Sequence, residues 1–115
     1  MEVMTSRNLG QLLIEDAGLK TLTTAPANTT LILKELLICN QGAADAEITV
    51  SAVPGGATPG PVHVFLYRLS VLAGETRTVA DCSTVLEAGW RLMAQSVGAP
   101  TLSLLASGIR IEVTA

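Results

Sequence analysis

The sequence is poor in aromatic and charged side chains. It contains one Phe, one Tyr and one Trp in 115 residues, and 15% of its residues are charged, against about 25% in ordinary soluble domains. Proteins that bind nucleic acids need clustered Lys and Arg, and those that bind single strands add aromatic stacking surfaces. With a net charge of −3 and scattered basic residues, we expect no nucleic-acid partner.

Groups for catalysis are equally scarce. The single histidine, His63, lies in an apolar segment, where we expect it to pack or to make a surface hydrogen bond. Asp81-Cys82-Ser83 has no histidine or lysine nearby in the sequence to activate Cys82. Since covalent hydrolysis requires a nucleophile, a base and a group that orients the base, we predict no enzyme, no catalytic residues and no cofactor.

Metal ligands are few. Cys39, Cys82 and one histidine cannot complete a four-ligand zinc site within one chain. Glu15-Asp16 and the acidic pair Asp45 and Glu47 lack the spacing of a calcium loop. We therefore predict no metal site. The cysteines are expected to be small, buried and unlinked, and a disulfide stays open as the alternative if their strands lie adjacent.

Long hydrophobic runs are missing as well. No apolar stretch approaches the roughly 18–20 residues that span a bilayer, so we expect no membrane partner. The first residues, MEVMTSRNL, do not have the pattern of an export signal. Synthesis in a cytoplasm without export is the expectation.

Short apolar strands dominate what remains. The sequence is 49% hydrophobic, and segments such as Ala46–Val53 alternate, with Ile48 and Val50 on one side. About eight such segments, spaced roughly ten residues apart, predict an all-β fold: an antiparallel β-sandwich of jelly-roll or immunoglobulin-like type. We assign the sandwich domain to residues 19–115 and an N-terminal arm to residues 1–18, which lack clear periodicity.

The segment 86–107 predicts a hairpin within this sandwich. Trp90–Val97 and Leu102–Ser107 are expected to fold back on each other at the turn Gly98 to Pro100. The side chains expected in the core are Trp90, Leu92, Leu102, Leu104, Ile48 and Val50.

The alternation of the last strand changes in its middle. Leu102, Leu104 and Ala106 occupy even positions, whereas apolar residues 109, 111 and 113 occupy odd ones. A glycine bulge at Ser107-Gly108 would reconcile the two halves by turning the odd residues inward and Arg110 and Glu112 outward.

Two other strands are apolar on both faces. In Thr29–Cys39, either both faces are buried or a bulge near Lys34-Glu35 changes the phase. In Val62–Ser70, the second face would leave a large exposed apolar patch on a monomer. We therefore predict an oligomer interface, with these members from the strand and from the arm: Phe65, Tyr67, Leu69, Leu12, Leu13 and Ile14.

Several local patterns carry a resemblance to a known group. They are Pro26 before the strand that ends Ile38-Cys39-Asn40, the Gly74-Glu75-Thr76 turn, Val85–Gly89 and the terminal Leu102–Val113. Together they resemble small β-sandwich accessory proteins of tailed bacteriophage virions; Trp90 stands where that group often has Asp. The resemblance implies a non-enzymatic structural subunit of a virion, of capsid decoration, collar, neck or tail type.

The resemblance also implies partners. They would be other virion structural proteins and copies of the chain itself in a homo-oligomer, for which a trimer is one candidate state. Two alternatives from other classes are a bacterial surface or pilus-like subunit, which would normally carry an export signal, and a ligand-binding β-sandwich module. The module would need an exposed aromatic surface or a polar groove.

Overall fold

The computed structural model describes residues 2–98 and 101–113, and nearly all of them lie in strands. One short 3-10 helix, Pro61–His63, precedes the fifth strand. The strands are β1 (Glu2–Ile14), β2 (Lys20–Thr24), β3 (Thr29–Asn40), β4 (Ala46–Val53), β5 (Val64–Val71), β6 (Thr76–Leu86), β7 (Arg91–Gly98) and β8 (Leu102–Val113). The all-β prediction is confirmed, and β4 has the predicted bounds.

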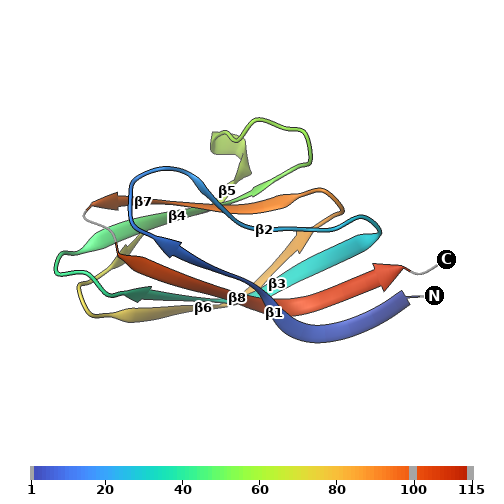
Figure 1. The fold of residues 1–115 in the computed structure, drawn as a ribbon, viewed down its shortest axis with the longest axis horizontal. Helices are drawn as coiled ribbons and strands as arrows, with labels where there is room; N and C mark the ends of the chain where they lie inside the picture. The colour runs from blue at the N-terminus through green and yellow to red at the C-terminus, as the bar shows by residue number, and fades with distance from the viewer. Residues whose placement is uncertain (1, 99–100, 114–115) are drawn as a thin grey trace.

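The strands form two four-stranded antiparallel sheets that pack face to face (Figure 1). Their orders are β1-β8-β3-β6 and β2-β7-β4-β5. Every connection crosses from one sheet to the other except the one between β4 and β5, which are neighbours. This interleaved order of eight strands is that of a jelly roll, so it decides between the two predicted sandwich types.

The crossing connections overturn the predicted hairpin. β7 pairs with β2 and β4, whereas β8 pairs with β1 and β3 in the opposite sheet. Two successive amphipathic strands can bury their apolar faces by pairing or by facing each other across the core, and alternation alone does not distinguish these arrangements. Of the predicted turn, Ala99 and Pro100 lie outside the described residues.

Residues 2–14 are a strand of the sandwich, whereas the sequence suggested an arm. β1 pairs with β8 from Glu2 to Ile14, and Leu9 and Ile14 are buried. The register shifts between Asn8 and Gly10, which interrupts the alternation. That shift explains why the segment shows no clear period in the sequence.

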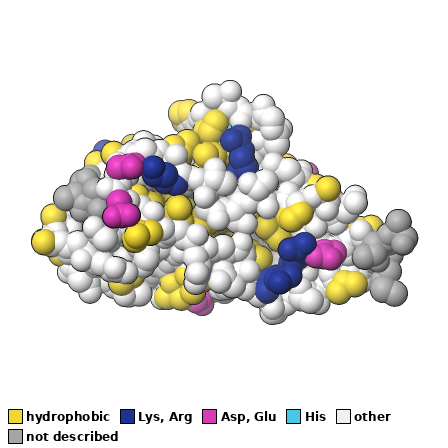
Figure 2. All heavy atoms as spheres, in the orientation of Figure 1, with side chains coloured by type: hydrophobic (Ala, Val, Ile, Leu, Met, Phe, Trp, Pro, Cys, Tyr) yellow, Lys and Arg dark blue, Asp and Glu magenta, His cyan; other side chains and the backbone are white. Residues whose placement is uncertain are grey.

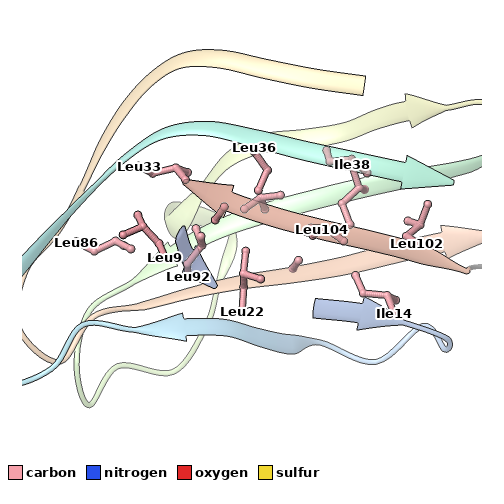
Figure 3. Packing of buried hydrophobic residues seen from close by; sticks show 14 of the residues in the cluster. Leu9, Ile14, Leu22, Leu33, Leu36, Ile38, Leu86, Leu92, Leu102 and Leu104 are labelled. Atoms are coloured by element: carbon pink, nitrogen blue, oxygen red, sulfur yellow. The ribbon is translucent and has the colours of Figure 1, made fainter. Parts of the chain in front are cut away.

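The core lies between the inner faces of the two sheets (Figure 3). β3 contributes Leu31, Leu33, Leu36 and Ile38, which meet side chains of β2, β7 and β8. The predicted core residues Ile48, Val50, Leu92, Leu102 and Leu104 are all buried. Trp90 is only partly buried; it precedes β7 and packs against the edge of the cluster.

A bulge in β3 changes which residues face the core. The register of β3 with β8 shifts between Leu33 and Glu35, at the site that the sequence suggested. Leu31 and Leu33 therefore face the core before the shift, and Leu36 and Ile38 face it afterwards. The bulge is confirmed as the reason why this strand is apolar on both faces.

β8 contains no phase change of its own, contrary to the prediction. At the same level, the extra residues belong to β1 and β3, and Gly108 pairs with Arg7 and with Leu33. The β3 backbone comes so close that a Cβ on Gly108 would lie 2.0 Å from the Ile32 carbonyl oxygen. Even-numbered β8 residues therefore continue on the inner side, and the odd-numbered residues 109, 111 and 113 lie on the outer face of the sheet.

Cys39 is a free, half-buried thiol whose backbone pairs with Thr76 at the start of β6. The side chain of Cys82, farther along β6, lies outside the part of the structure that is described. That the two cysteines are unlinked therefore stays a prediction.

Candidate functional site

The candidate site lies beside β5, on the outer face of the sheet β2-β7-β4-β5. β5 is the edge strand of this sheet, and its register with β4 shifts twice, between Ile48 and Val50 and between Val50 and Ser51. These extra residues in β5 turn both of its aromatic rings outward: Phe65 is 39% and Tyr67 is 73% exposed. Structural irregularity therefore places two of the three aromatic side chains of the protein on its surface.

The loop between β4 and β5 folds back over the same face. The Arg91 guanidinium donates a 2.6 Å hydrogen bond to the Ala57 carbonyl, and His63 Nδ1 accepts one of 3.1 Å from the Gly60 amide. Ser51 and Met93 point outward in register but are buried, because the loop covers this part of the sheet. In Figure 1 the loop and its short helix stand above this sheet. The surface hydrogen bond expected of His63 is present.

A groove of about 510 Å³ runs between this loop and the strands. Its sides are largely apolar and include Pro59, Pro61 and Tyr67; its more polar residues include Thr49, Ser51 and Gln95. A concave site of this size with a few convergent polar groups is typical of a binding site.

Arg68 borders the groove in a strained backbone conformation. Its φ is 51°, a left-handed value that costs a non-glycine residue roughly 1–2 kcal/mol. Its amide donates to Thr49 Oγ1 at 3.1 Å, and its Nε donates to Glu47 Oε1 at 2.9 Å. The Glu47 carboxylate, followed by a hydrogen bond with Tyr67, raises the pKa of the Arg68 guanidinium above its ordinary value. The groove therefore carries a permanent, partly neutralised cation.

The other predicted interface residues do not join this site. Leu69, which pairs with Ile48 of β4, packs against the core. Ile14 is fully buried. Leu12 is half-buried against the core, whereas Leu13 is exposed on the outer face of the other sheet. The predicted interface thus divides: Phe65 and Tyr67 lie on one side of the sandwich, Leu13 lies on the other, and Leu69 and Ile14 belong to the interior.

Reactive groups do not converge on this surface. Among the described residues, no three His, Cys, Asp or Glu side chains gather to hold a metal ion, and no helix of the same residues is long and apolar enough to cross a membrane. The face shown in Figure 2 carries hydrophobic side chains between a few charged ones, some of which lie beside a charge of the opposite sign. Around the groove, the described geometry offers shape, aromatic surface and hydrogen-bonding groups.

Comparison with known proteins supports the fold assignment. No family model matches the sequence, and no curated protein is similar to it in sequence. Among solved structures, a chain of the T13 viral particle of IBDV superimposes with a TM-score of 0.59 at 8% identity, over 97% of this chain and 31% of that one. This protein therefore spans about a third of the length of the IBDV chain.

A second similar structure has nearly the same length. It is a chain from the acid-stable capsid of Helicobacter pylori bacteriophage KHP30, with a TM-score of 0.54 at 10% identity, over 100% of this chain and 95% of that one. At such identities the similarity concerns the fold alone. The fold is the jelly roll of viral capsid proteins.

Proposed function

We propose that this protein is a non-enzymatic structural subunit of a bacteriophage particle, an accessory component of capsid decoration, collar, neck or tail type. The observation that carries the proposal is the full-length similarity to the KHP30 capsid chain. In that chain the jelly roll accounts for nearly the whole polypeptide, whereas it is about a third of the IBDV chain. The presence of such a chain in a bacteriophage capsid supports a structural role in a particle for a domain of this fold.

Contact with another particle protein is proposed at the groove beside β5. Of the three aromatic residues of the protein, Tyr67 is exposed and lines this groove. Phe65, two residues earlier in β5, is exposed as well. Aromatic and Arg side chains are enriched among the residues that dominate binding energy at protein interfaces. Arg68, at the same site, adds a hydrogen-bonding cation.

The remaining parts of the proposal concern location and partners. The chain would be made in the host cytoplasm and incorporated into the virion, and it would associate with itself and with other virion proteins. A trimer is one candidate state of the homo-oligomer. The sparse basic and aromatic residues support partners other than nucleic acid, and the short apolar runs support partners other than membranes.

One observation favours a second function. The groove combines an exposed Tyr67 ring with the polar side chains of Thr49 and Gln95, which are the features that a ligand-binding module requires. In that case the groove would hold a small ligand, and Tyr67 would supply an apolar surface against it.

Incorporation into particles tests the proposal. Phe65→Ser together with Tyr67→Ser should leave the circular dichroism spectrum unchanged but remove the protein from purified particles. The matched control is Leu72→Ser, which changes a comparably exposed residue outside the groove and should leave incorporation intact. Incorporation of the double variant at the wild-type level would contradict the groove as the contact site. Absence of the wild-type protein from particles would overturn the structural role and leave the ligand-binding function.

A further inference from the structure

The outer face of the sheet β1-β8-β3-β6 is rich in aliphatic side chains. Residues paired across antiparallel strands point to the same side, and the inner side is fixed by the buried residues of β3. The aliphatic side chains on the other side, here called the outer aliphatic face, are Met4, Leu13, Ile32, Leu37, Val85, Leu105, Ile109, Ile111 and Val113.

These side chains form continuous rows across the strands. Ile32 pairs with Val85 on one side and with Ile109 on the other, which gives a row over three strands. In the next row Ile111 pairs with Met4, and Met4 is 64% exposed. Near the opposite end, Leu37 pairs with Leu105. The apolar surface therefore extends along most of the sheet.

No described element of the chain covers this face. The long loop between β4 and β5 lies against the other sheet, and the outer side of β1-β8-β3-β6 in Figure 1 carries no further segment. β8 is 12 residues long and the sheet has four strands, which gives an area of about 40 Å by 19 Å, or roughly 750 Å². A typical specific interface buries about 800 Å² on each partner, so this one face is large enough for a stable dimer.

Charges of both signs lie near the middle of the face. Lys34 and Glu35 are adjacent at the β3 bulge, and together with Arg7 of β1 they border a depression of about 490 Å³ that also includes Ser107 and Ile109. Among the described residues Glu35 makes no ion pair. In a two-fold interface, residue i of one copy meets residue j of the other, and the reverse contact occurs as well. A two-fold axis near this bulge would bring each Lys34 to the Glu35 of the second copy.

We propose that the outer aliphatic face binds the same face of a second copy of this chain, about a two-fold axis near Lys34 and Glu35. The proposal deepens the self-association of the proposed function by naming the surface and its symmetry. It also accounts for the outward position of residues 109, 111 and 113. In an isolated chain these apolar side chains would face solvent, whereas in a dimer they would belong to the apolar core of the interface.

Sedimentation velocity on the purified protein tests this directly. The wild type should sediment as a species with twice the 11.9 kDa mass of one chain. Val85→Thr together with Ile109→Thr should raise the dissociation constant of the dimer at least tenfold. Threonine keeps the β propensity of both positions. The matched control is Leu72→Thr, a comparably exposed residue between β5 and β6 that lies outside both surfaces, and this variant should remain a dimer.

Charge reversal provides a second test that does not depend on the apolar variants folding. Lys34→Glu should weaken the dimer, and Lys34→Glu with Glu35→Lys should restore it, because the swapped charges again meet across the axis. A wild-type monomer or trimer would overturn the proposal, as would a dimer that withstands the Val85 and Ile109 changes. Since no particle is involved, failure here is distinguishable from failure of virion incorporation. A protein that is monomeric in solution but incorporated would indicate that a different particle protein covers this face.

Discussion

The two sheets share one core but present different outer faces. The outer side of β1-β8-β3-β6 is aliphatic and uncovered, and its charges near the centre are Arg7, Lys34 and Glu35. The outer side of β2-β7-β4-β5 has polar residues such as Thr49 and Gln95, is partly covered by a loop and displays two aromatic rings. The first face suits a large symmetric contact, and the second suits a smaller, more specific one.

The comparison explains the unusual composition of the chain. A sandwich needs one apolar face per strand, and the excess aliphatic residues are concentrated on the outer side of one sheet. Bulges make this possible: β1 and β3 shift register while β8 continues unchanged, so Ile109 and Ile111 are carried to the outer side. The excess of apolar residues in the composition therefore corresponds to one surface of this protein, the outer side of β1-β8-β3-β6.

The largest effect is expected where inner and outer residues adjoin on one strand. Leu36 is fully buried, whereas Leu37 lies on the outer aliphatic face. Leu36→Ala should lower the free energy of unfolding by about 2–5 kcal/mol. Leu37→Ala should cost less, about 1 kcal/mol in a dilute monomer, because Leu37 is only half-buried and lies outside the core. Urea unfolding measures both, and equal costs would mean that the faces of β3 are misassigned.

The next largest effect concerns the close approach of β3 and β8. Gly108→Ala should destabilise the protein by about 3 kcal/mol, the upper part of the range for over-packing, because the added Cβ meets the Ile32 carbonyl at 2.0 Å. The matched control is Gly60→Ala, where a Cβ has no atom within 4 Å. Thermal unfolding of the two variants compares them. Similar midpoints of thermal unfolding for the two variants would show that the close approach of β3 and β8 at Gly108 does not contribute to stability.

Local patterns in the sequence predict much of this fold. Ala46–Val53 is a strand with the expected faces because its alternation is uninterrupted, and the phase conflict at Lys34-Glu35 marks a real bulge. The strands that pair with β7 and β8 could not be predicted from the sequence, because alternation specifies which face of a strand is buried but not which strand lies beside it. The predicted faces of β8 are wrong for a related reason. The prediction places apolar residues toward the interior of a single chain, whereas residues 109, 111 and 113 lie on an outer face.

The candidate site was predictable only in part. Phe65 and Tyr67 are conspicuous as aromatic residues in a chain that has so few, and the structure places both at the surface. Arg68 and Gln95 were not identified, because the groove is assembled from β4, β5, β7 and a loop that are distant in sequence. The polar residue Arg68 within an apolar strand was the available indication.

A smaller effect is expected where a side chain links the two sheets. Asn40, fully buried at the end of β3, donates from Nδ2 to the Val71 carbonyl of β5 at 3.0 Å and to the Ala44 carbonyl at 2.9 Å. Asn40→Ala should cost about 2 kcal/mol, since the buried carbonyl of Val71 loses its donor. Gln41→Ala, next in sequence but exposed, should stay within about 0.5 kcal/mol of wild type by urea unfolding. Equal effects would indicate that water replaces the amide.

The smallest effect is expected at the turn that carries the chain from one sheet to the other. Lys20 Nζ lies 3.0 Å from Asp16 Oδ1, and the hydrogen bond from Lys20, followed by that from the Gly18 amide, lowers the pKa of the Asp16 carboxyl below 3.8. A carboxyl whose pKa falls on folding stabilises the protein above its unfolded pKa, and this contribution is lost as the pH falls through the folded value. Lys20→Met should therefore shift the urea midpoint slightly near pH 7, and this shift should shrink as the pH falls through the folded pKa of Asp16 and its carboxyl becomes protonated in both states. Added salt should reduce the small difference near pH 7, because the pair is exposed and screened. A large shift of the urea midpoint that persisted in acid would mean that the apolar stem of Lys20, rather than its charge, holds β2 in place. The expected difference between a strong buried link at Asn40 and a weak exposed one at Asp16 would then be wrong.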